Sequence, residues 1–509
     1  MRLVCLLFLG IIYIISGVNI AYGQRANQYQ LELGGFVASD QTPFWLRANQ
    51  YGTVPLKSSL GRLSAGLKSD YQSTDSTGYR PRVDWGYGIN AVINTGKTNQ
   101  VLLPEAYVKG RWGALELYIG RRKEVIGLMD TLLTTGSYIW SGNALPMPKI
   151  QLAVPQFTPI GLTKGVISLM GTFAHGWFEN ADRLIKGVYL HQSSLYGRIG
   201  KPSWLLRLYG GFNHQVMWGG YTNYVSPNIG ADGRLPSSIK YFPAVVLGTR
   251  DPFPEDQNIQ TITRFEENRI GNHLGSIDLA ADVNIGRWNL FAYRQFVYDD
   301  GSLFYGTNLE DGLNGLRLKN GNEPKGSPFF LRQITVEYLF TGSQGGEVFV
   351  LEDPKLRGRD DYFNHSQYLD GWTYFGRTIG TPFLTPQQEV NSSLPPRFGI
   401  ANNRVSVFHI GLSALVVGKV DITTRLSFSK NAGTYVTPYL TLPREFSGLL
   451  TASIPVNLFG GTVLNGSLAV DSGELLPNSV GGYVSLRKIG VFERQRKSRS
   501  VLSPRWPFK

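Results

Sequence analysis

The stretch from Arg357 to Pro386 places arginines among a dense set of aromatic residues. Glycines interrupt it at short intervals, so we expect repeated turns and neither a helix nor a regular strand. An aromatic ring can stack on the apolar face of a sugar, and a guanidinium can pair with a carboxylate through two hydrogen bonds. This combination predicts a loop that holds sugars bearing acid groups, with five candidate contacts: Arg359, Tyr362, Trp372, Tyr374 and Arg377. The alternative is a large surface loop whose aromatic side chains bury one another.

Motifs for catalysis or metal binding are absent from the sequence. The six histidines form no H-x-H or H-E-x-x-H pair, and no G-x-S-x-G turn exposes a serine nucleophile. The glycines from Gly86 to Gly88 approximate a dinucleotide fingerprint but lie in an apparent strand with no helix after it. Adjacent acids such as Asp360-Asp361 and Glu266-Glu267 seldom flank a scissile bond. We therefore expect a non-catalytic protein without a metal or a cofactor.

The N-terminus has the pattern of a secretory signal peptide. Arg2 precedes an apolar run from Leu3 to Ile15, and Ala21-Tyr22-Gly23 is a small-residue cleavage site. Residues 1–23 are predicted to be this signal. The single cysteine, Cys5, lies within it, so the mature chain would have no disulfide.

The mature chain shows a hydrophobic period of two. Ile277, Leu279 and Val283, for example, share one face of a segment whose other face carries Asp278 and Asp282. Such segments of roughly ten residues recur along the whole chain, with polar loops between them. A soluble sandwich would also alternate, but it would need a second sheet. The recurrence predicts an all-β fold: a transmembrane antiparallel β-barrel of about 16–18 strands over residues 24–492, followed by a basic tail at 493–509.

The strand starts and the connections follow from the same pattern. The starts are expected near Tyr29, Ser59, Val83, Gln100, Leu115, Ile150, Lys164, Leu195, Trp204, His273, Trp288, Leu331, Glu347, Val405, Val417, Phe446, Thr462 and Gly481. Long connections are predicted at Trp218–Asn272, Asp299–Phe329 and Leu351–Asn402, facing outward or folding into the lumen. A short helix is expected over Glu124–Leu133.

An ordered set of segments resembles the Wzi capsule-assembly family, especially its members from Bacteroidetes-type bacteria. The segments are QTPFWLRANQYG at 41–52, GSYIWSGNALPMPKIQL at 136–152, HGWF at 175–178, LHQSSLYGRIG at 190–200, MWGG at 217–220, the stretch from 357 onward, and NNRVSVFHIG at 402–411. The resemblance implies an outer-membrane barrel that binds exported polysaccharide and helps to keep it on the cell surface. Trp140, Trp177 and Trp218 lie in these segments and complete the candidate glycan-binding residues.

The charge of the chain indicates the kind of partner. The net charge is +13, or +12 once Arg2 leaves with the signal. For an exported basic protein the expected partners are an acidic capsular or extracellular polysaccharide and the outer-membrane lipid with its lipopolysaccharide, not nucleic acid. We expect a monomer. Two other functions remain open, a porin that passes anionic or sugar solutes and a barrel hydrolase.

Overall fold

The chain forms a closed barrel in the computed structural model, which describes residues 27–72, 81–224, 229, 233–249, 269–299, 302–321, 327–350 and 352–492. The predicted signal peptide and the basic tail lie outside these residues. No helix among them is long and apolar enough to cross a membrane.

Eighteen antiparallel strands make up the described barrel, which agrees with the predicted fold class and strand number. They are β1 (Asn27–Ala38), β2 (Leu60–Ser69), β3 (Val83–Gly96), β4 (Gln100–Trp112), β5 (Leu115–Arg121), β6 (Pro148–Pro159), β7 (Ile167–Trp177), β8 (Tyr189–Ile199), β9 (Leu206–Trp218), β10 (Asn272–Ile285), β11 (Trp288–Asp299), β12 (Gly312–Asn320), β13 (Phe329–Phe340), β18 (Val405–Val416), β19 (Val420–Asn431), β20 (Arg444–Val456), β21 (Thr462–Gly473) and β22 (Ser479–Phe492).

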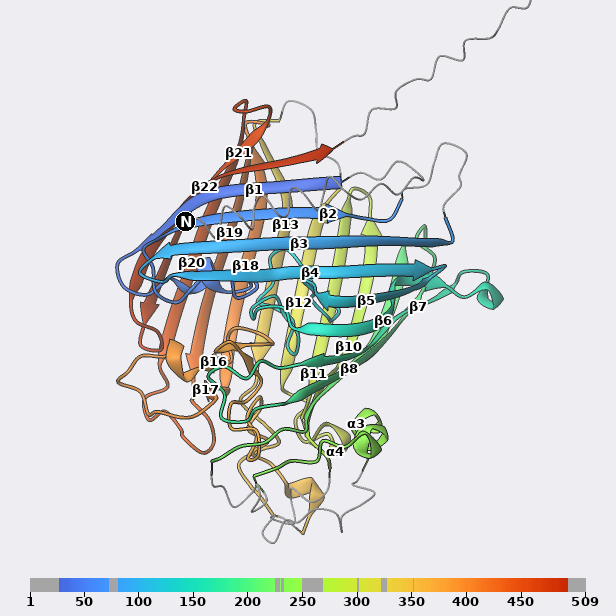
Figure 1. Ribbon diagram of the computed structural model, residues 1–509, viewed down its shortest axis with the longest axis vertical. Helices are drawn as coiled ribbons and strands as arrows, with labels where there is room; N and C mark the ends of the chain where they lie inside the picture. Colours follow the sequence, from blue (N-terminus) through green and yellow to red (C-terminus); the bar gives the residue numbers. More distant parts are fainter. Residues whose placement is uncertain are drawn as a thin grey trace, which may run out of the picture.

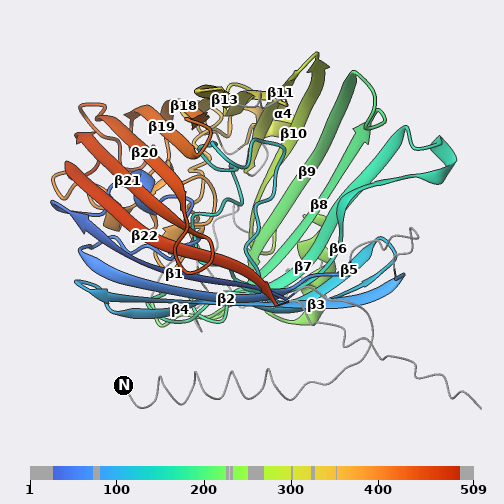
Figure 2. The same cartoon turned by 90° about the horizontal axis from the view of Figure 1, so that it is seen from above.

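Each barrel strand pairs with the strand next to it in the sequence, and the first strand pairs with the last. Asn27 of β1 lies opposite Phe492 of β22, and Ala38 lies opposite Gly481, so the ring closes without a free edge (Figure 2). Closure matters because every backbone group inside a bilayer must find a partner within the protein.

The alternation has the expected physical result. On β10, Ile277 and Leu279 are 44% and 51% exposed and face outward, whereas Ser276 and Asp278 are buried inside the barrel. The outer face is therefore apolar and the inner face polar, as lipid outside and a polar lumen require.

Short turns lie at one end of the barrel, for example Gly286-Arg287 between β10 and β11. The long connections lie at the other end, where Figure 1 shows α3 (Phe242–Leu247), α4 (Ser302–Tyr305), β16 (Thr385–Pro386) and β17 (Ile400–Asn402). The remaining short elements are α2 (Phe44–Arg47), η1 (Gly161–Thr163), η2 (Ile239–Tyr241), η5 (Pro354–Leu356), β14 (Thr373–Tyr374), β15 (Arg377–Thr378) and η6 (Gln387–Glu389).

Two strand predictions were wrong. The segment near Glu347 forms no barrel strand; it contributes only the isolated bridge between Phe349 and Arg357, since Gly345 and Gly346 turn the chain just before it. Conversely, β12 lies inside the predicted connection Asp299–Phe329.

The sequence of β12 hides its alternation because glycine occupies the inward position 315. A Cβ at this position would come within 2.1 Å of the Tyr293 ring. The ring of Tyr293 on β11 therefore fills the lumen space beside Gly315.

The predicted helix over Glu124–Leu133 was also wrong. This segment contains no helix, and its polar groups are satisfied by the barrel wall. The backbone N–H of Leu128, for example, donates to Asp278 of β10 at 2.9 Å. Tertiary contacts here replace the local hydrogen bonds that a helix would make.

Candidate functional site

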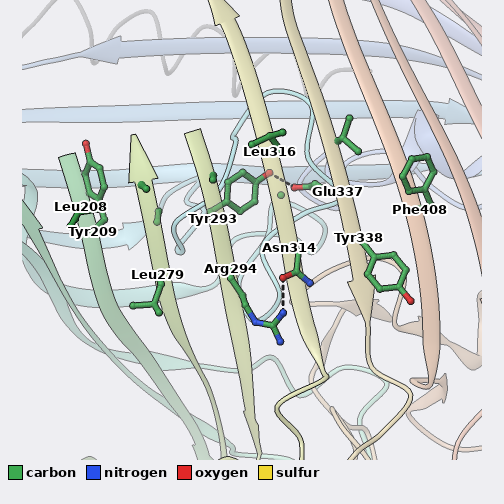
Figure 3. Close-up of a pocket in the computed structure, with 15 residues that line it drawn as sticks. Leu208, Tyr209, Leu279, Tyr293, Arg294, Asn314, Leu316, Glu337, Tyr338 and Phe408 are labelled. Atoms are coloured by element: carbon green, nitrogen blue, oxygen red, sulfur yellow. Dashed lines mark hydrogen bonds between the residues drawn. The ribbon is translucent and has the colours of Figure 1, made fainter. Parts of the chain in front are cut away.

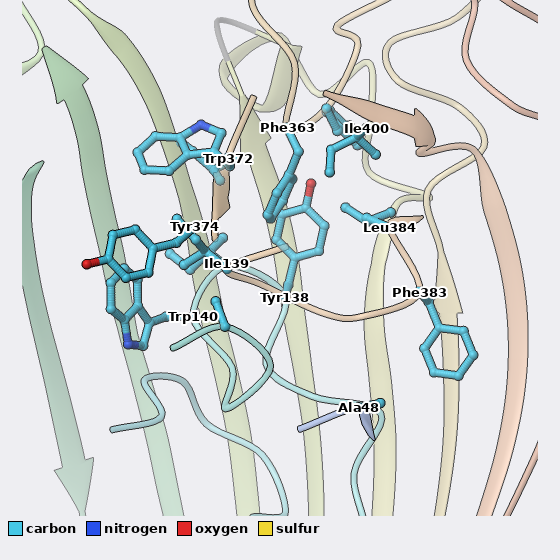
Figure 4. Packing of buried hydrophobic residues seen from close by; sticks show 14 of the residues in the cluster. Ala48, Tyr138, Ile139, Trp140, Phe363, Trp372, Tyr374, Phe383, Leu384 and Ile400 are labelled. Carbon is cyan, nitrogen blue, oxygen red and sulfur yellow. The ribbon is translucent and has the colours of Figure 1, made fainter. Parts of the chain in front are cut away.

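Three connections from the long-loop end fold back into the barrel and pack together. We call residues 41–54, 122–147 and 361–402 the plug. Figure 4 shows part of its buried core, where Tyr138 of the second connection lies among Phe363, Leu384 and Ile400 of the third. The first connection joins them, because the rings of Phe44 and Phe383 lie 4.8 Å apart.

Inward side chains around the barrel hold the plug. Trp45 donates to Ser427 of β19 at 3.2 Å, and the Nε2 atom of His409 on β18 lies 2.6 Å from the Leu133 carbonyl. Further contacts reach other strands: Leu128–Asp278 on β10, Tyr138–Gln295 on β11, Thr135–Glu337 on β13, Ile139–Gln215 on β9, Phe44–Asp471 on β21 and Thr53–Arg62 on β2. Anchors on so many strands show that the plug crosses the lumen from wall to wall.

A buried ion triad joins two of the three connections. Glu389 is 2% exposed and accepts hydrogen bonds from both Arg47 and Arg377, the latter at 3.0 Å. Arg377 also donates to the Val54 carbonyl at 2.9 Å, which ties it to the first connection. Burial alone would raise the pKa of Glu389, but Arg47 and Arg377 together hold that pKa below its ordinary value. The carboxylate is therefore charged and fully paired.

A second ionic cluster fixes the connection between β5 and β6. Glu124 bonds to Lys149 at 2.8 Å, to Arg122 at 2.7 Å and to the Tyr118 hydroxyl at 2.8 Å. Burial opposes the charged form, yet Lys149 and Arg122 lower the pKa of Glu124 to about 2. The Lys149 ammonium also lies 4.7 Å from the centre of the Trp140 ring. This cation–π contact covers a ring face of Trp140 that a sugar would need.

Most of the predicted glycan contacts in the 357–386 stretch are internal to the plug. Tyr362, Trp372 and Tyr374 have no exposed surface, and Arg377 belongs to the buried triad. Trp372 packs near Phe178, and the Tyr362 hydroxyl donates to Asp311 at 2.7 Å. In this arrangement a sugar cannot reach the aromatic ring faces or the Arg377 guanidinium. The structure therefore agrees with the self-packed alternative given for this stretch.

Trp177 and Trp218 are separate from the plug, because they lie on the outer face of the barrel. Their strand register places both on the same face as Tyr189 of β8, pointing away from the lumen. Trp218 is 2% exposed because Phe242 of α3 packs 5.8 Å from it, whereas Trp177 is 38% exposed. The eight predicted residues therefore do not form one site.

Arg359 alone of the predicted arginines is exposed at the long-loop end. Its Nε donates to the Glu347 carbonyl at 2.7 Å, and in the part of the chain that the structure describes its two terminal nitrogens make no hydrogen bond. Tyr435, partly exposed in the β19–β20 connection, lies nearby, with the guanidinium of Arg359 5.9 Å and that of Arg404 3.7 Å from its ring centre. We call Arg359, Arg404 and Tyr435 the mouth cluster.

Sequence reasoning missed Arg404 and Tyr435. Arg404 lies in the segment 402–411, which contributed to the family resemblance, but no neighbouring residue in the sequence marked it as a sugar contact. The pattern around Tyr435 is a plain turn sequence. The pairing of β18 with β19 brings these two residues together, and hydrogen bonds from both to the 342–343 backbone place them near Arg359, which binds the Glu347 carbonyl.

The backbone around the mouth cluster is strained. Arg359, Asp361 and Phe363 adopt φ angles of 65°, 45° and 68°, in the left-handed region that L residues rarely occupy. The ion pair between Arg397 and Asp361 and the hydrogen bond from Asn403 to Asp361 hold this conformation. Strain of about 1–3 kcal/mol per residue persists only where surrounding contacts enforce it, and it concentrates at functional sites.

The family model for capsule assembly protein Wzi matches residues 21–398. The chain belongs to the Wzi family. This match confirms the resemblance to the Wzi family, and the protein is a bacterial outer-membrane β-barrel. The end with the long connections is then the extracellular end, since such barrels have short periplasmic turns.

The solved structure of a Wzi protein shows the same fold. Wzi from Escherichia coli, described as an outer-membrane protein involved in group 1 capsule assembly and a carbohydrate-binding β-barrel, is 14% identical, with a TM-score of 0.57 over 90% of this chain and 84% of that one. The Pseudomonas aeruginosa protein OccK5 is 10% identical, with a TM-score of 0.44 over 92% and 98% of the two chains. No curated protein matches the chain.

Proposed function

We propose that this Wzi-family barrel binds an acidic polysaccharide at its extracellular mouth and helps to retain capsule or exopolysaccharide on the cell surface, without catalysis. The observation that carries the proposal is the plug, a set of packed connections anchored around the inner wall. A filled lumen suits a protein that holds a polymer outside and does not suit a diffusion pore.

The mouth cluster is the proposed point of contact. Arg359 presents free guanidinium N–H groups to solvent, and a carboxylate on a sugar is their natural partner. Arg404 covers Tyr435 and adds a second positive charge beside it. The buried residues Tyr362, Trp372, Tyr374 and Arg377 would support this surface by holding the connection in place, with Trp140 in the same supporting role.

Each contact of this kind is weak, because an exposed charge pair contributes about 1 kcal/mol or less. A polymer offers the same acid group repeatedly, so contacts along it add without a new site of high affinity. We therefore expect the protein to retain a long polymer and to bind a single sugar only weakly.

The test is calorimetric binding of the host's own surface polysaccharide to the purified barrel. Arg359→Gln and Tyr435→Ala should each weaken binding several-fold, about what the loss of 1 kcal/mol produces, and binding should decline as salt increases. Lys355→Gln removes an exposed charge from the same connection outside the cluster and serves as the matched control. Unchanged binding by both cluster variants, with normal folding, would remove the mouth cluster from the proposal.

Deletion of the gene provides the cellular test. Polymer synthesis should continue while more polymer is released into the medium. A complete loss of polymer would point to synthesis or export in place of surface retention.

A further inference from the structure

The lipid-facing surface carries one feature that an apolar barrel wall does not need. Arg294 of β11 points outward, opposite Leu279 of β10 and Asn314 of β12. Its neighbours on this face, Leu279, Leu316, Tyr338 and Phe408, are 44–51% exposed, which is the exposure of side chains that meet lipid. An ionisable residue on such a face is costly and calls for a partner.

The protein satisfies this guanidinium only in part. Its Nη1 donates to the Asn314 side chain at 2.6 Å, and its Nη2 donates to the Leu309 carbonyl (Figure 3 shows the first bond). The Nε atom is buried and has no hydrogen-bond partner among the described residues. A guanidinium has five N–H groups, so after these two bonds one N–H on each terminal nitrogen remains for an anion.

A groove of about 730 Å³ lies beside Arg294 on the same face. The smallest outward side chains that line it are those of Ala281 and Ala292, which lie opposite each other on β10 and β11 and form its floor. Leu208 and Leu279 border it on one side, and Leu316 with Tyr338 and Phe408 on the other (Figure 3). Small residues flanked by large apolar ones form a shallow apolar groove, open to the outside, that can accept a hydrocarbon chain.

The direction of the groove agrees with the bilayer. Ala292 lies two residues closer than Arg294 to the short turn at Gly286, so the small side chains lie on the periplasmic side of Arg294. The Arg294 side chain reaches toward Leu309 in the connection at the extracellular end. A lipid of the outer leaflet has the same polarity, with its head group outward and its chains inward.

We infer that this groove binds one acyl chain of a phosphate-bearing outer-leaflet lipid, with the phosphate on Arg294 and Asn314. Lipid A, the membrane anchor of lipopolysaccharide, has this chemistry. The inference is independent of the polysaccharide proposal, because the groove lies on the outer wall and shares no residue with the mouth cluster or the plug.

Native mass spectrometry of the detergent-solubilised barrel tests the inference, with purified lipid A as the probe. The wild-type barrel should retain lipid A. In a competition, lipid A should displace phosphatidylethanolamine, a zwitterionic lipid, from the barrel. Arg294→Gln should weaken retention about tenfold, as the loss of a charge-assisted bond predicts. Ala292→Trp, which fills the floor with an outward side chain, should weaken it as well.

Arg317→Gln is the matched control, because it removes an arginine from the adjacent strand β12 on the lumen side. It should retain lipid A as wild type does. Each variant is first checked for slower gel migration on boiling, which shows that the barrel is closed.

Two results would overturn the inference. In the first, folded Arg294→Gln and Ala292→Trp both retain lipid A like wild type. In the second, inorganic phosphate alone at millimolar concentration displaces lipid A, which would make Arg294 an anion site without a role for the groove.

Discussion

Removal of the Glu389 carboxylate should open the plug while the barrel stays closed. Glu389 and its partners Arg47 and Arg377 are at most 8% exposed in their side chains, so Glu389→Ala leaves two guanidinium groups buried without an anion. Breaking a buried pair in this way costs about 3–5 kcal/mol. Since 1.4 kcal/mol is a factor of ten, the open plug should become about a hundredfold to a few thousandfold more populated.

The cost should fall on the plug and not on the strands, because none of the three residues belongs to a barrel strand. Single-channel conductance in planar bilayers measures the opening. Wild type should show little conductance, and Glu389→Ala should show frequent openings. Limited proteolysis should cut residues 361–402 faster in the variant, while migration on unheated gels stays that of a folded barrel.

Asp421→Ala is the matched control, because it removes the acid of the partly exposed pair with Arg332 on the barrel wall. An exposed pair contributes about 1 kcal/mol or less, so this variant should conduct like wild type. If Glu389→Ala also conducts and resists proteolysis like wild type, the triad does not hold the plug and the reasoning fails.

Three further predictions concern pH, packing and the membrane. The pKa of Glu124 is lowered to about 2 and that of Glu389 is also lowered, so their stabilisation of the plug is complete above the unfolded value of about 4.3 and is lost as the pH falls through the folded values. Conductance should therefore rise between pH 4 and pH 2, and a flat profile over that range would contradict the assignment. Trp372→Ala removes a fully buried ring and should destabilise the plug by about 3–5 kcal/mol; polysaccharide binding should then decline indirectly, with a parallel gain in proteolysis that a direct contact residue would not show. The protein should fractionate with the outer membrane and migrate faster unheated than boiled, and recovery from the periplasm as a soluble protein would exclude the barrel.

The period-two pattern by itself determined the fold class. Alternation is a local property, since neighbouring side chains of any strand point to opposite faces, and closure is the way to pair every strand in lipid. It therefore located β10 and β11 and the tight turn at Gly286. It failed for β12, where the Tyr293 ring fills the lumen space beside Gly315. It also failed near Glu347, where a short alternating run bridges to Arg357 and to no barrel strand.

The tertiary structure decided the site. Whether an aromatic or arginine side chain is open to a ligand depends on which connections fold into the lumen, and that depends on contacts far apart in the sequence. Arg47 and Glu389 are 342 residues apart, and Tyr138 meets Gln295 on a distant strand. The composition of the 357–386 stretch is the same for a sugar-binding surface and for a buried plug. Only the closed ring, which brings these connections together, made Trp372 and Arg377 internal and left Arg359 at the surface beside Tyr435.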